Sequence, residues 1–259
     1  MRTLSVALTA LLVALVSGCS APPAPDVALP PAGAVADYQL GGAYDPAPEV
    51  TLVVRDSTEA PAPGRYSVCY LNAFQTQPGE TPAADLLLTD QDGESIADPD
   101  WPDERLVDIR TDAALERAAD GIARCADAGF DAVEFDNLDS FTRSAGLLDA
   151  EDALAFAADL VQEAHAAGLA AGQKNTAELT EHGHRTGFDF AVAEECDVFE
   201  ECAAYTDVYG DAVIAIEYTD DLRRPFAEVC ADPDRPATMI LRDRDLVPAG
   251  EPGHVFEHC

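Results

Sequence analysis

The sequence predicts an α/β protein that folds as a single-domain (β/α)8 TIM barrel. Eight short apolar or β-branched segments, each bounded by turn residues, recur over about 220 residues, as expected of strands. Segments with helical spacing separate most of the later ones, and this alternation is typical of a barrel. An open doubly wound sheet is the alternative, but no glycine-rich phosphate loop follows the first strand.

The first 18 residues predict a lipoprotein signal peptide. Arg2 precedes an apolar run from Leu4 to Val16, which is short for a membrane-spanning helix. The small residues Ser17 and Gly18 then precede Cys19, and this order resembles the bacterial lipobox, in which the cysteine is lipidated. An ordinary signal peptide with a chance cysteine is the alternative. We therefore expect an exported protein, lipid-anchored through Cys19 at the cell membrane and facing outward.

Residues 19–35 are rich in proline and alanine. Proline favours extended conformations that need no core. This segment is therefore expected to be a tether between the membrane and a barrel domain at residues 36–259.

The predicted elements of the barrel follow in order along the chain. A helix is expected after Thr111, a favourable N-cap, and it should end at Gly129. The third strand is followed by a long insertion, residues 75–106, in which Trp101 could stack on a sugar ring or pin the loop to the barrel. The predicted strands are 37–40, 50–55, 66–72, 131–136, 169–174, 188–194, 212–218 and 237–242, and the predicted helices are 111–128, 151–167, 176–184, 201–209 and 221–230.

Six cysteines remain after Cys19. An even number of cysteines in an exported protein predicts disulfides. A zinc site is the alternative, but the spacing matches no compact ligand pattern. We expect one pair to clamp a short loop, one to fix the C-terminus, and the remaining two cysteines to join: Cys196–Cys202, Cys230–Cys259 and Cys69–Cys125.

The formal net charge of -34 excludes nucleic acid as a partner, because phosphate would be repelled. An acidic surface can attract a cationic substrate, although coding bias or adaptation to salt would also produce it. Of the 15 basic residues, only Lys174 is a lysine.

Carboxylates gather at the end of the fourth predicted strand. Glu134 and Asp136 are two residues apart, so they point to the same side of the strand. Buried acids are costly unless they are neutralised or used, and a structural salt-bridge network is the alternative explanation. Further polar residues end the neighbouring strands, and the C-terminal ends of barrel strands form the active face. These residues are Asn137, Asp139, Lys174, Asn175, Glu194, Glu195 and Glu217.

The residue types restrict the chemistry. No serine-nucleophile motif is present, and the five histidines fall on predicted helices or near the C-terminus. Two carboxylates on facing strands suit glycoside hydrolysis, in which crowding keeps one acid protonated as the proton donor. Lys174 could instead form a Schiff base, as in aldolase barrels, but a lysine flanked by acids favours an ion pair. No metal or cofactor is expected.

A series of motifs carries a family resemblance over residues 36–259. The motifs are Tyr38-Gln39-Leu40, Cys69-Tyr70-Leu71-Asn72, the stretch from Trp101 to Arg110, the stretch from Asp131 to Asp139, Gly172-Gln173-Lys174-Asn175, Ala193-Glu194-Glu195-Cys196 and Ile216-Glu217-Tyr218. In this order they resemble glycoside hydrolase family 114, the endo-α-1,4-polygalactosaminidase-like TIM-barrel proteins. Ala132 and Phe135 stand where that family usually has glycine and proline.

The resemblance implies hydrolysis of α-1,4-linked galactosamine polymers by Asp136 and Glu194, with Glu195 as the alternative second acid. An acidic subsite would suit the ammonium groups of such a polymer. A non-catalytic, lipid-anchored sugar-binding protein on the same barrel is the alternative, but the presence of both acids favours the enzyme. We expect a monomer. The expected substrate-binding residues are Tyr38, Glu134, Asn137, Asp139, Lys174, Asn175, Glu195, Glu217 and Tyr218.

Overall fold

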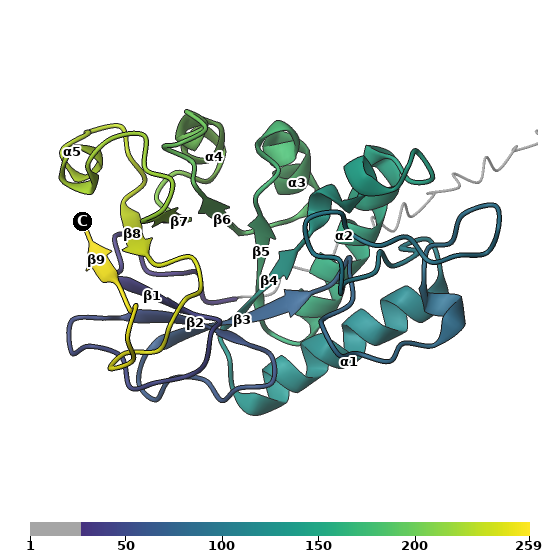
Figure 1. Cartoon of the computed structure of the whole chain (residues 1–259). Helices are drawn as coiled ribbons and strands as arrows, with labels where there is room; N and C mark the ends of the chain where they lie inside the picture. The colour runs from purple at the N-terminus through teal and green to yellow at the C-terminus, as the bar shows by residue number, and fades with distance from the viewer. Residues whose placement is uncertain (1–26) are drawn as a thin grey trace, which may run out of the picture.

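Eight parallel strands form a barrel in the order in which they occur along the chain, as a computed structural model shows for residues 27–259 (Figure 1). The signal peptide, Cys19 and the first part of the predicted tether lie outside the described residues. All eight predicted strands are present, and their ends differ from the prediction by at most two residues. The strands are β1 (Ala36–Gln39), β2 (Leu52–Asp56), β3 (Tyr66–Asn72), β4 (Ala132–Asp136), β5 (Ala170–Lys174), β6 (Phe190–Glu194), β7 (Val213–Tyr218) and β8 (Thr238–Arg242). The TIM-barrel prediction is confirmed.

Five helices cover the outside of β3 to β8, whereas loops alone connect β1 to β2 and β2 to β3 (Figure 1). The Thr111 side chain accepts a hydrogen bond from the Ala114 amide, and Gly129 ends the same helix with φ of 92°. Besides the five α-helices, there are short 3₁₀ segments at Ala84–Leu86, Leu138–Arg143 and Ala177–Leu179. The helices are α1 (Asp112–Ala128), α2 (Ala150–Ala166), α3 (Thr180–Thr186), α4 (Cys202–Tyr209) and α5 (Phe226–Cys230).

The last helix is shorter than the sequence predicted. The prediction began it at Asp221, but α5 begins after Pro225. A residue that precedes proline disfavours helical backbone, so the helix cannot extend through Arg224. One element was not predicted: β9 (Phe256–His258) pairs antiparallel with β8.

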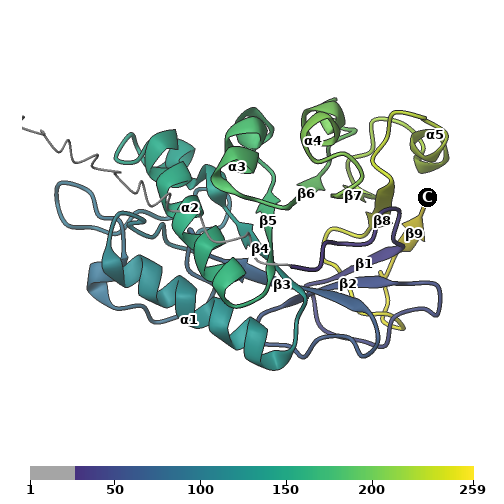
Figure 2. The same cartoon turned by 180° about the vertical axis from the view of Figure 1, so that it is seen from behind.

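The seam between β1 and β8 is closed by a side chain. The two strands lie side by side (Figure 2), but within residues 27–259 they form no hydrogen-bonded ladder. Arg242, fully buried at the end of β8, places Nη1 3.0 Å from Asp37 Oδ1 and also donates to the carbonyl of Tyr38. Its other nitrogens donate to the carbonyls of Val247 and Val255. One arginine thus makes four hydrogen bonds at this seam, and two of them link β8 to β1 where the ladder is missing.

Alternation along the strands separates two cores. Side chains such as Val54, Val192 and Ile216 fill the interior of the barrel. The residues between them, such as Val133 and Ala215, face outward and pack against the helices. This period of two decides which strand-end side chains reach the site.

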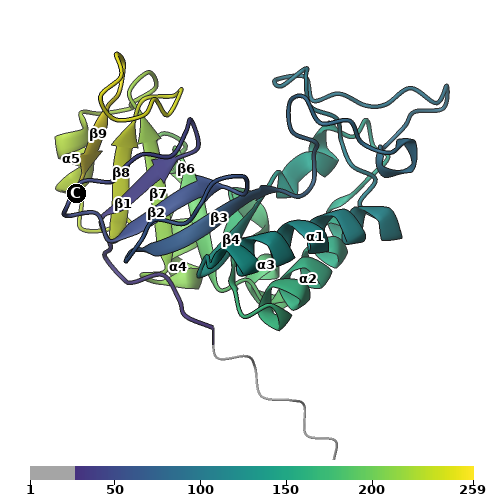
Figure 3. The same ribbon diagram turned by 90° about the horizontal axis from the view of Figure 1, so that it is seen from below.

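The insertion after β3 is a packed loop rather than a free one. Leu86 and Leu88 are buried, and short bridges pair Gln75 with Leu106 and Leu87 with Val107. In Figure 3 the insertion and the loop between β8 and β9 project from the same end of the barrel. Together they extend the walls of the barrel beyond its strands.

All three predicted disulfides are confirmed. Cys69 joins Cys125, Cys196 joins Cys202, and Cys230 joins Cys259. The first ties β3 to α1, the second closes the loop after β6, and the third fixes the C-terminus beside α5.

Residues 27–35 form no helix or strand, but they touch the barrel: Ala34 is buried, and Tyr66 donates a hydrogen bond to the carbonyl of Ala28. No helix of residues 27–259 has the length and apolarity needed to cross a membrane.

Candidate active site

A cleft of about 630 Å³ opens at the C-terminal ends of the strands. Its floor comes from strands β1 to β7, and its walls come from the insertion and the loop after β8. Most of the predicted site residues line it, and Glu134 lies buried directly beneath. The predicted residues that line the cleft are Tyr38, Asp136, Asn137, Asp139, Lys174, Asn175, Glu194, Glu195 and Tyr218.

Lys174 is the centre of the floor. Its side chain is only 2% exposed, and its Nζ lies 3.1 Å from Glu194 Oε2, 3.5 Å from Asp136 Oδ1 and 3.8 Å from Glu134 Oε1. Burial lowers the pKa of Lys174, but the three carboxylates outweigh it and raise the pKa well above its usual value. A protonated amine cannot attack a carbonyl group, so the geometry favours the ion pair over Schiff-base chemistry.

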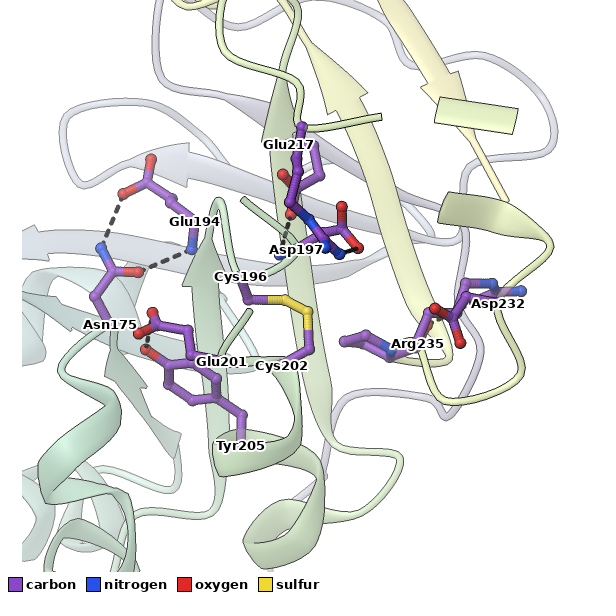
Figure 4. Close-up of a disulfide and its surroundings, with 12 residues drawn as sticks. Asn175, Glu194, Cys196, Asp197, Glu201, Cys202, Tyr205, Glu217, Asp232 and Arg235 are labelled. Carbon is purple, nitrogen blue, oxygen red and sulfur yellow. Dashed lines mark hydrogen bonds and ion pairs between the residues drawn. A yellow bond between two sulfur atoms is a disulfide. The ribbon is translucent and has the colours of Figure 1, made fainter. Parts of the chain in front are cut away.

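Glu194 is held in its ionised form. Burial raises its pKa, but Lys174 and hydrogen bonds from Tyr218 and Asn175 outweigh this effect, so the pKa lies below its usual value. The Asn175 side chain bonds twice, because Nδ2 donates to Glu194 Oε2 at 3.0 Å and Oδ1 accepts from the Glu194 amide at 2.8 Å (Figure 4). These bonds fix the direction of the carboxylate.

Asp136 has a comparable set of donors. The Tyr70 hydroxyl donates to Oδ2 at 2.6 Å, and the amide of Asn137 donates to Oδ1 at 2.9 Å. Because Lys174 Nζ lies 3.5 Å from Asp136 Oδ1 and 3.1 Å from Glu194 Oε2, those two oxygens are at most about 6.6 Å apart, the sum of the two distances. The two carboxylates therefore contact the same ammonium group and are close enough to act on the same glycosidic bond.

Glu134 belongs to the layer below. The Tyr38 hydroxyl donates to Glu134 Oε1 at 2.6 Å and accepts from Lys174 Nζ at 2.9 Å. Burial raises the pKa of Glu134 to about 7 against the opposing effect of Lys174. Glu134 thus lies beneath Lys174 as a fully buried carboxyl group that is partly protonated at neutral pH.

The backbone turns sharply after β4, β5 and β6. Asn137 (φ 67°), Asn175 (φ 48°) and Glu195 (φ 60°) directly follow β4, β5 and β6, and all three have left-handed backbone. Asparagine tolerates this region, whereas a glutamate there costs roughly 1 kcal/mol or more. Strain of this kind is concentrated at functional sites. Here the left-handed backbone at Glu195 makes its side chain point in a different direction from that of Glu194.

Glu195 makes an ion pair on the rim. Arg244, from the loop after β8, places Nη2 2.6 Å from Glu195 Oε1 and stacks its guanidinium over the Tyr218 ring at 4.3 Å. Glu195 is therefore engaged by an arginine, while Glu194 faces Lys174. This arrangement favours Glu194 as the second acid.

Glu217 is not brought into the cleft, contrary to the prediction. Its neighbours Ile216 and Tyr218 face the interior, so alternation along β7 turns Glu217 outward. Its Oε1 accepts from the Asp197 amide at 2.9 Å (Figure 4), and burial raises its pKa to about 7. Glu217 holds the loop after β6 and does not line the cleft.

Several cleft residues were not predicted from the sequence. Tyr70 could have been found, since it lies two residues before the last residue of β3 and shares the inward direction of Val68. Arg143 ends the short 3₁₀ segment after β4 and Arg244 lies on the loop after β8, and at neither position does a regular sequence pattern indicate the direction of the side chain. Arg143 bonds Asp139 at 2.8 Å and Asp98 at 2.7 Å, so the predicted Asp139 is ion-paired at the rim.

A TIM barrel with two facing, hydrogen-bonded carboxylates in its C-terminal cleft defines a glycosidase. Residues 18–259 match the sequence profile of the glycoside-hydrolase family GH114. The chain therefore belongs to this family, which confirms the resemblance read from its motifs, and it is a glycosidase.

Two solved structures are similar to the whole barrel. Aspergillus fumigatus Ega3, in complex with galactosamine, is 22% identical, with a TM-score of 0.72 over 88% of this chain and 96% of Ega3. The glycoside hydrolase domain of PelA from Pseudomonas aeruginosa is 13% identical, with a TM-score of 0.58 over 83% of this chain and 97% of that domain. At these identities the similarity establishes the fold. No curated protein sequence matches the chain.

Proposed function

We propose that this glycosidase hydrolyses α-1,4-linked galactosamine-containing polysaccharide with Asp136 and Glu194 as its catalytic acids. The observation that carries the proposal is the placement of these two carboxylates on either side of Lys174, at the floor of an open cleft. One acid protonates the glycosidic oxygen, and the other attacks the anomeric carbon or activates water.

The substrate class follows from the charge of the cleft. Nine carboxyl side chains line it against three basic ones, Arg143, Lys174 and Arg244. All three basic side chains are already ion-paired with acids of the site. The surplus of negative charge suits a polymer that carries ammonium groups. The galactosamine in the complex of the similar Ega3 structure supports the same class.

Product analysis tests this proposal. The purified barrel is incubated with fully deacetylated α-1,4-galactosamine polymer and with its N-acetylated form, and released oligosaccharides are identified by mass spectrometry. We expect cleavage of the deacetylated polymer. Cleavage of only the N-acetylated polymer, or of neither, contradicts the proposed substrate.

We also propose that the enzyme is an exported, monomeric lipoprotein held at the cell membrane by Cys19. The support is the apolar run before Ser17-Gly18-Cys19 and the three disulfides, which are typical of oxidising compartments. Light scattering of the purified barrel tests the monomer, and lipid labelling tests the anchor.

A further inference from the structure

A turn at residues 98–104 of the insertion presents two unlike side chains to the cleft. Asp98 anchors this turn from below, because its Oδ1 accepts from the amides of Asp100 at 2.8 Å and Trp101 at 3.2 Å. The amide of Glu104 closes the turn by donating to the Trp101 carbonyl at 2.8 Å. Trp101 and Glu104 both line the cleft, so one rigid turn delivers an aromatic ring and a carboxylate together.

Trp101 does not pin the insertion to the barrel. Its side chain is 64% exposed, which is unusual for the only tryptophan of the chain. The insertion is held instead by buried Leu86 and Leu88 and by Asp98. An exposed indole on the wall of a sugar-cleaving cleft offers a flat apolar face for a pyranose ring.

Glu104 is a half-buried carboxylate that lacks a counter-charge. The Asn72 side chain donates to Oε2 at 3.0 Å, and within residues 27–259 no basic side chain lies within ion-pair distance of either oxygen. Arg143, the basic residue nearest in the network, already bonds Asp98 and Asp139.

The surroundings of Glu104 are acidic. Its pKa is raised to about 7, mainly by burial and also by Asp136 from β4 and Asp98 from the insertion, against the Asn72 hydrogen bond and Arg143 from the 3₁₀ segment after β4. Such a carboxylate is stabilised in its charged form when a cation binds beside it. Glu104 lines the same cleft as Asp136 and is affected by its charge, so that cation would bind in the cleft that holds the proposed catalytic acids.

We infer that Trp101 and Glu104 form an amino-sugar subsite, in which Glu104 binds the ammonium group of a galactosamine unit and Trp101 stacks on its ring. This inference rests on the proposed function and deepens it, because it names the residue that selects deacetylated units. An N-acetyl group is neutral and bulkier, so it leaves Glu104 without its counter-charge and costs the desolvation of an unpaired carboxyl.

The test compares Glu104→Gln with Glu94→Gln. Glu94 lies in the same insertion but is exposed and outside the cleft, so it is a matched control. The readout is the ratio of kcat/KM for deacetylated over N-acetylated oligomers. We expect Glu104→Gln to lower this ratio by roughly 10- to 100-fold, the worth of one charge-assisted hydrogen bond, and Glu94→Gln to leave it unchanged. Trp101→Ala should raise KM for both oligomers without changing the ratio.

Binding separates this inference from the proposed function. Affinity for a deacetylated galactosamine oligomer is measured by calorimetry in the Glu194→Gln protein, with and without Glu104→Gln. If the wild type cleaves neither oligomer, the proposed function fails. The subsite is then tested only by the difference in affinity between the Glu194→Gln protein and the double variant. An unchanged ratio, or unchanged affinity in the double variant, overturns the inference while the proposed function stands.

The pH profile excludes a merely structural role for Glu104. Binding of the ammonium should release the proton from Glu104, so affinity in the Glu194→Gln protein should fall as the pH drops below about 7. The amine of the ligand titrates equally in both proteins, so only the difference between them reports on Glu104. Profiles that coincide would overturn the inference.

Discussion

The Nζ atom of Lys174 lies 3.1 Å from Oε2 of Glu194 at the floor of the cleft, where the lysine side chain is 2% exposed and the glutamate side chain is 25% exposed. This contact joins the one lysine of the sequence to a proposed catalytic acid. Asp136 and Glu134 lie within 4 Å of the same nitrogen, so the charge state of the whole floor depends on one cation. A barrel with a surplus of acid can keep two catalytic carboxyls close together only because this cation offsets their repulsion.

Replacing Lys174 by methionine should abolish hydrolysis and weaken the fold. Removal of one partner from a buried ion pair costs about 3 kcal/mol of unfolding free energy. Without the lysine, burial leaves the carboxyls with pKa values above those of the unfolded chain, so the loss should be smallest at low pH and grow as the pH rises through neutrality. Urea denaturation at pH 5 and pH 8 checks this, and an equal loss at both pH values would contradict it.

Asp136→Asn and Glu194→Gln should each abolish hydrolysis while leaving the thermal midpoint nearly unchanged, because Lys174 keeps its other two carboxylates in either variant. Both substitutions keep the shape of the side chain but remove its ability to transfer a proton or to attack. Glu195→Gln is the matched control, because its carboxylate pairs with Arg244 at the rim. Inactivity of Glu195→Gln with activity retained in Glu194→Gln would show that the adjacent glutamate is the second acid.

The sequence could predict the barrel because each strand is a short apolar run, and it could predict most of the floor because the polar residues end those runs. Parallel strands bring their C-terminal ends to one face, so Asp136, Lys174 and Glu194 had to meet. Applying the period of two strictly would also have placed Tyr70 inside and excluded Glu217, since Tyr218 occupies the inward position.

The rest could not be predicted from local pattern. Arg244 reaches Glu195 across 49 residues of sequence, and Arg242 closes the barrel against Asp37 across 205. The Arg242 contact joins β8 to β1 and depends on how the two ends of the sheet meet. The Arg244 contact depends on how the loop after β8 returns to the barrel, and loops carry no periodicity that fixes the direction of a side chain. The same applies to Glu104, whose position depends on the anchored turn at Asp98.

Removing the Cys69–Cys125 disulfide should destabilise the fold more than removing Cys196–Cys202. The two bonds join residues 56 and 6 positions apart, and loop-closure entropy gives about 4 and about 2 kcal/mol respectively. Double Cys→Ser variants of each pair, compared by urea denaturation, check the order. Equal losses, or a greater loss from the shorter loop, would show that chain entropy does not govern these bonds.

Cys19 should carry lipid, and Cys19→Ser should release the enzyme from membranes into the soluble fraction. The prediction follows from the small residues that precede Cys19. Labelled fatty acid should co-migrate with the wild-type protein and be absent from the variant. If the wild type stays unlabelled, the signal peptide is an ordinary one and the protein is released after cleavage.

The stereochemistry of hydrolysis follows from the separation of the two acids. Retaining glycosidases hold their carboxyl groups about 5–5.5 Å apart, and inverting ones about 6.5–9.5 Å apart, to admit water. Asp136 Oδ1 and Glu194 Oε2 are at most about 6.6 Å apart, the sum of their 3.5 Å and 3.1 Å distances to Lys174 Nζ, and that limit is reached only if the lysine lies on the line between them. An Oδ1–Nζ–Oε2 angle below about 160° brings the pair under the lower limit of the inverting range, so we predict retention. NMR of the first-formed product decides, because an α-linked polymer should then release the α-anomer before mutarotation. A β-anomer that appears first would mean inversion, with a water molecule between acids that are farther apart in the substrate complex.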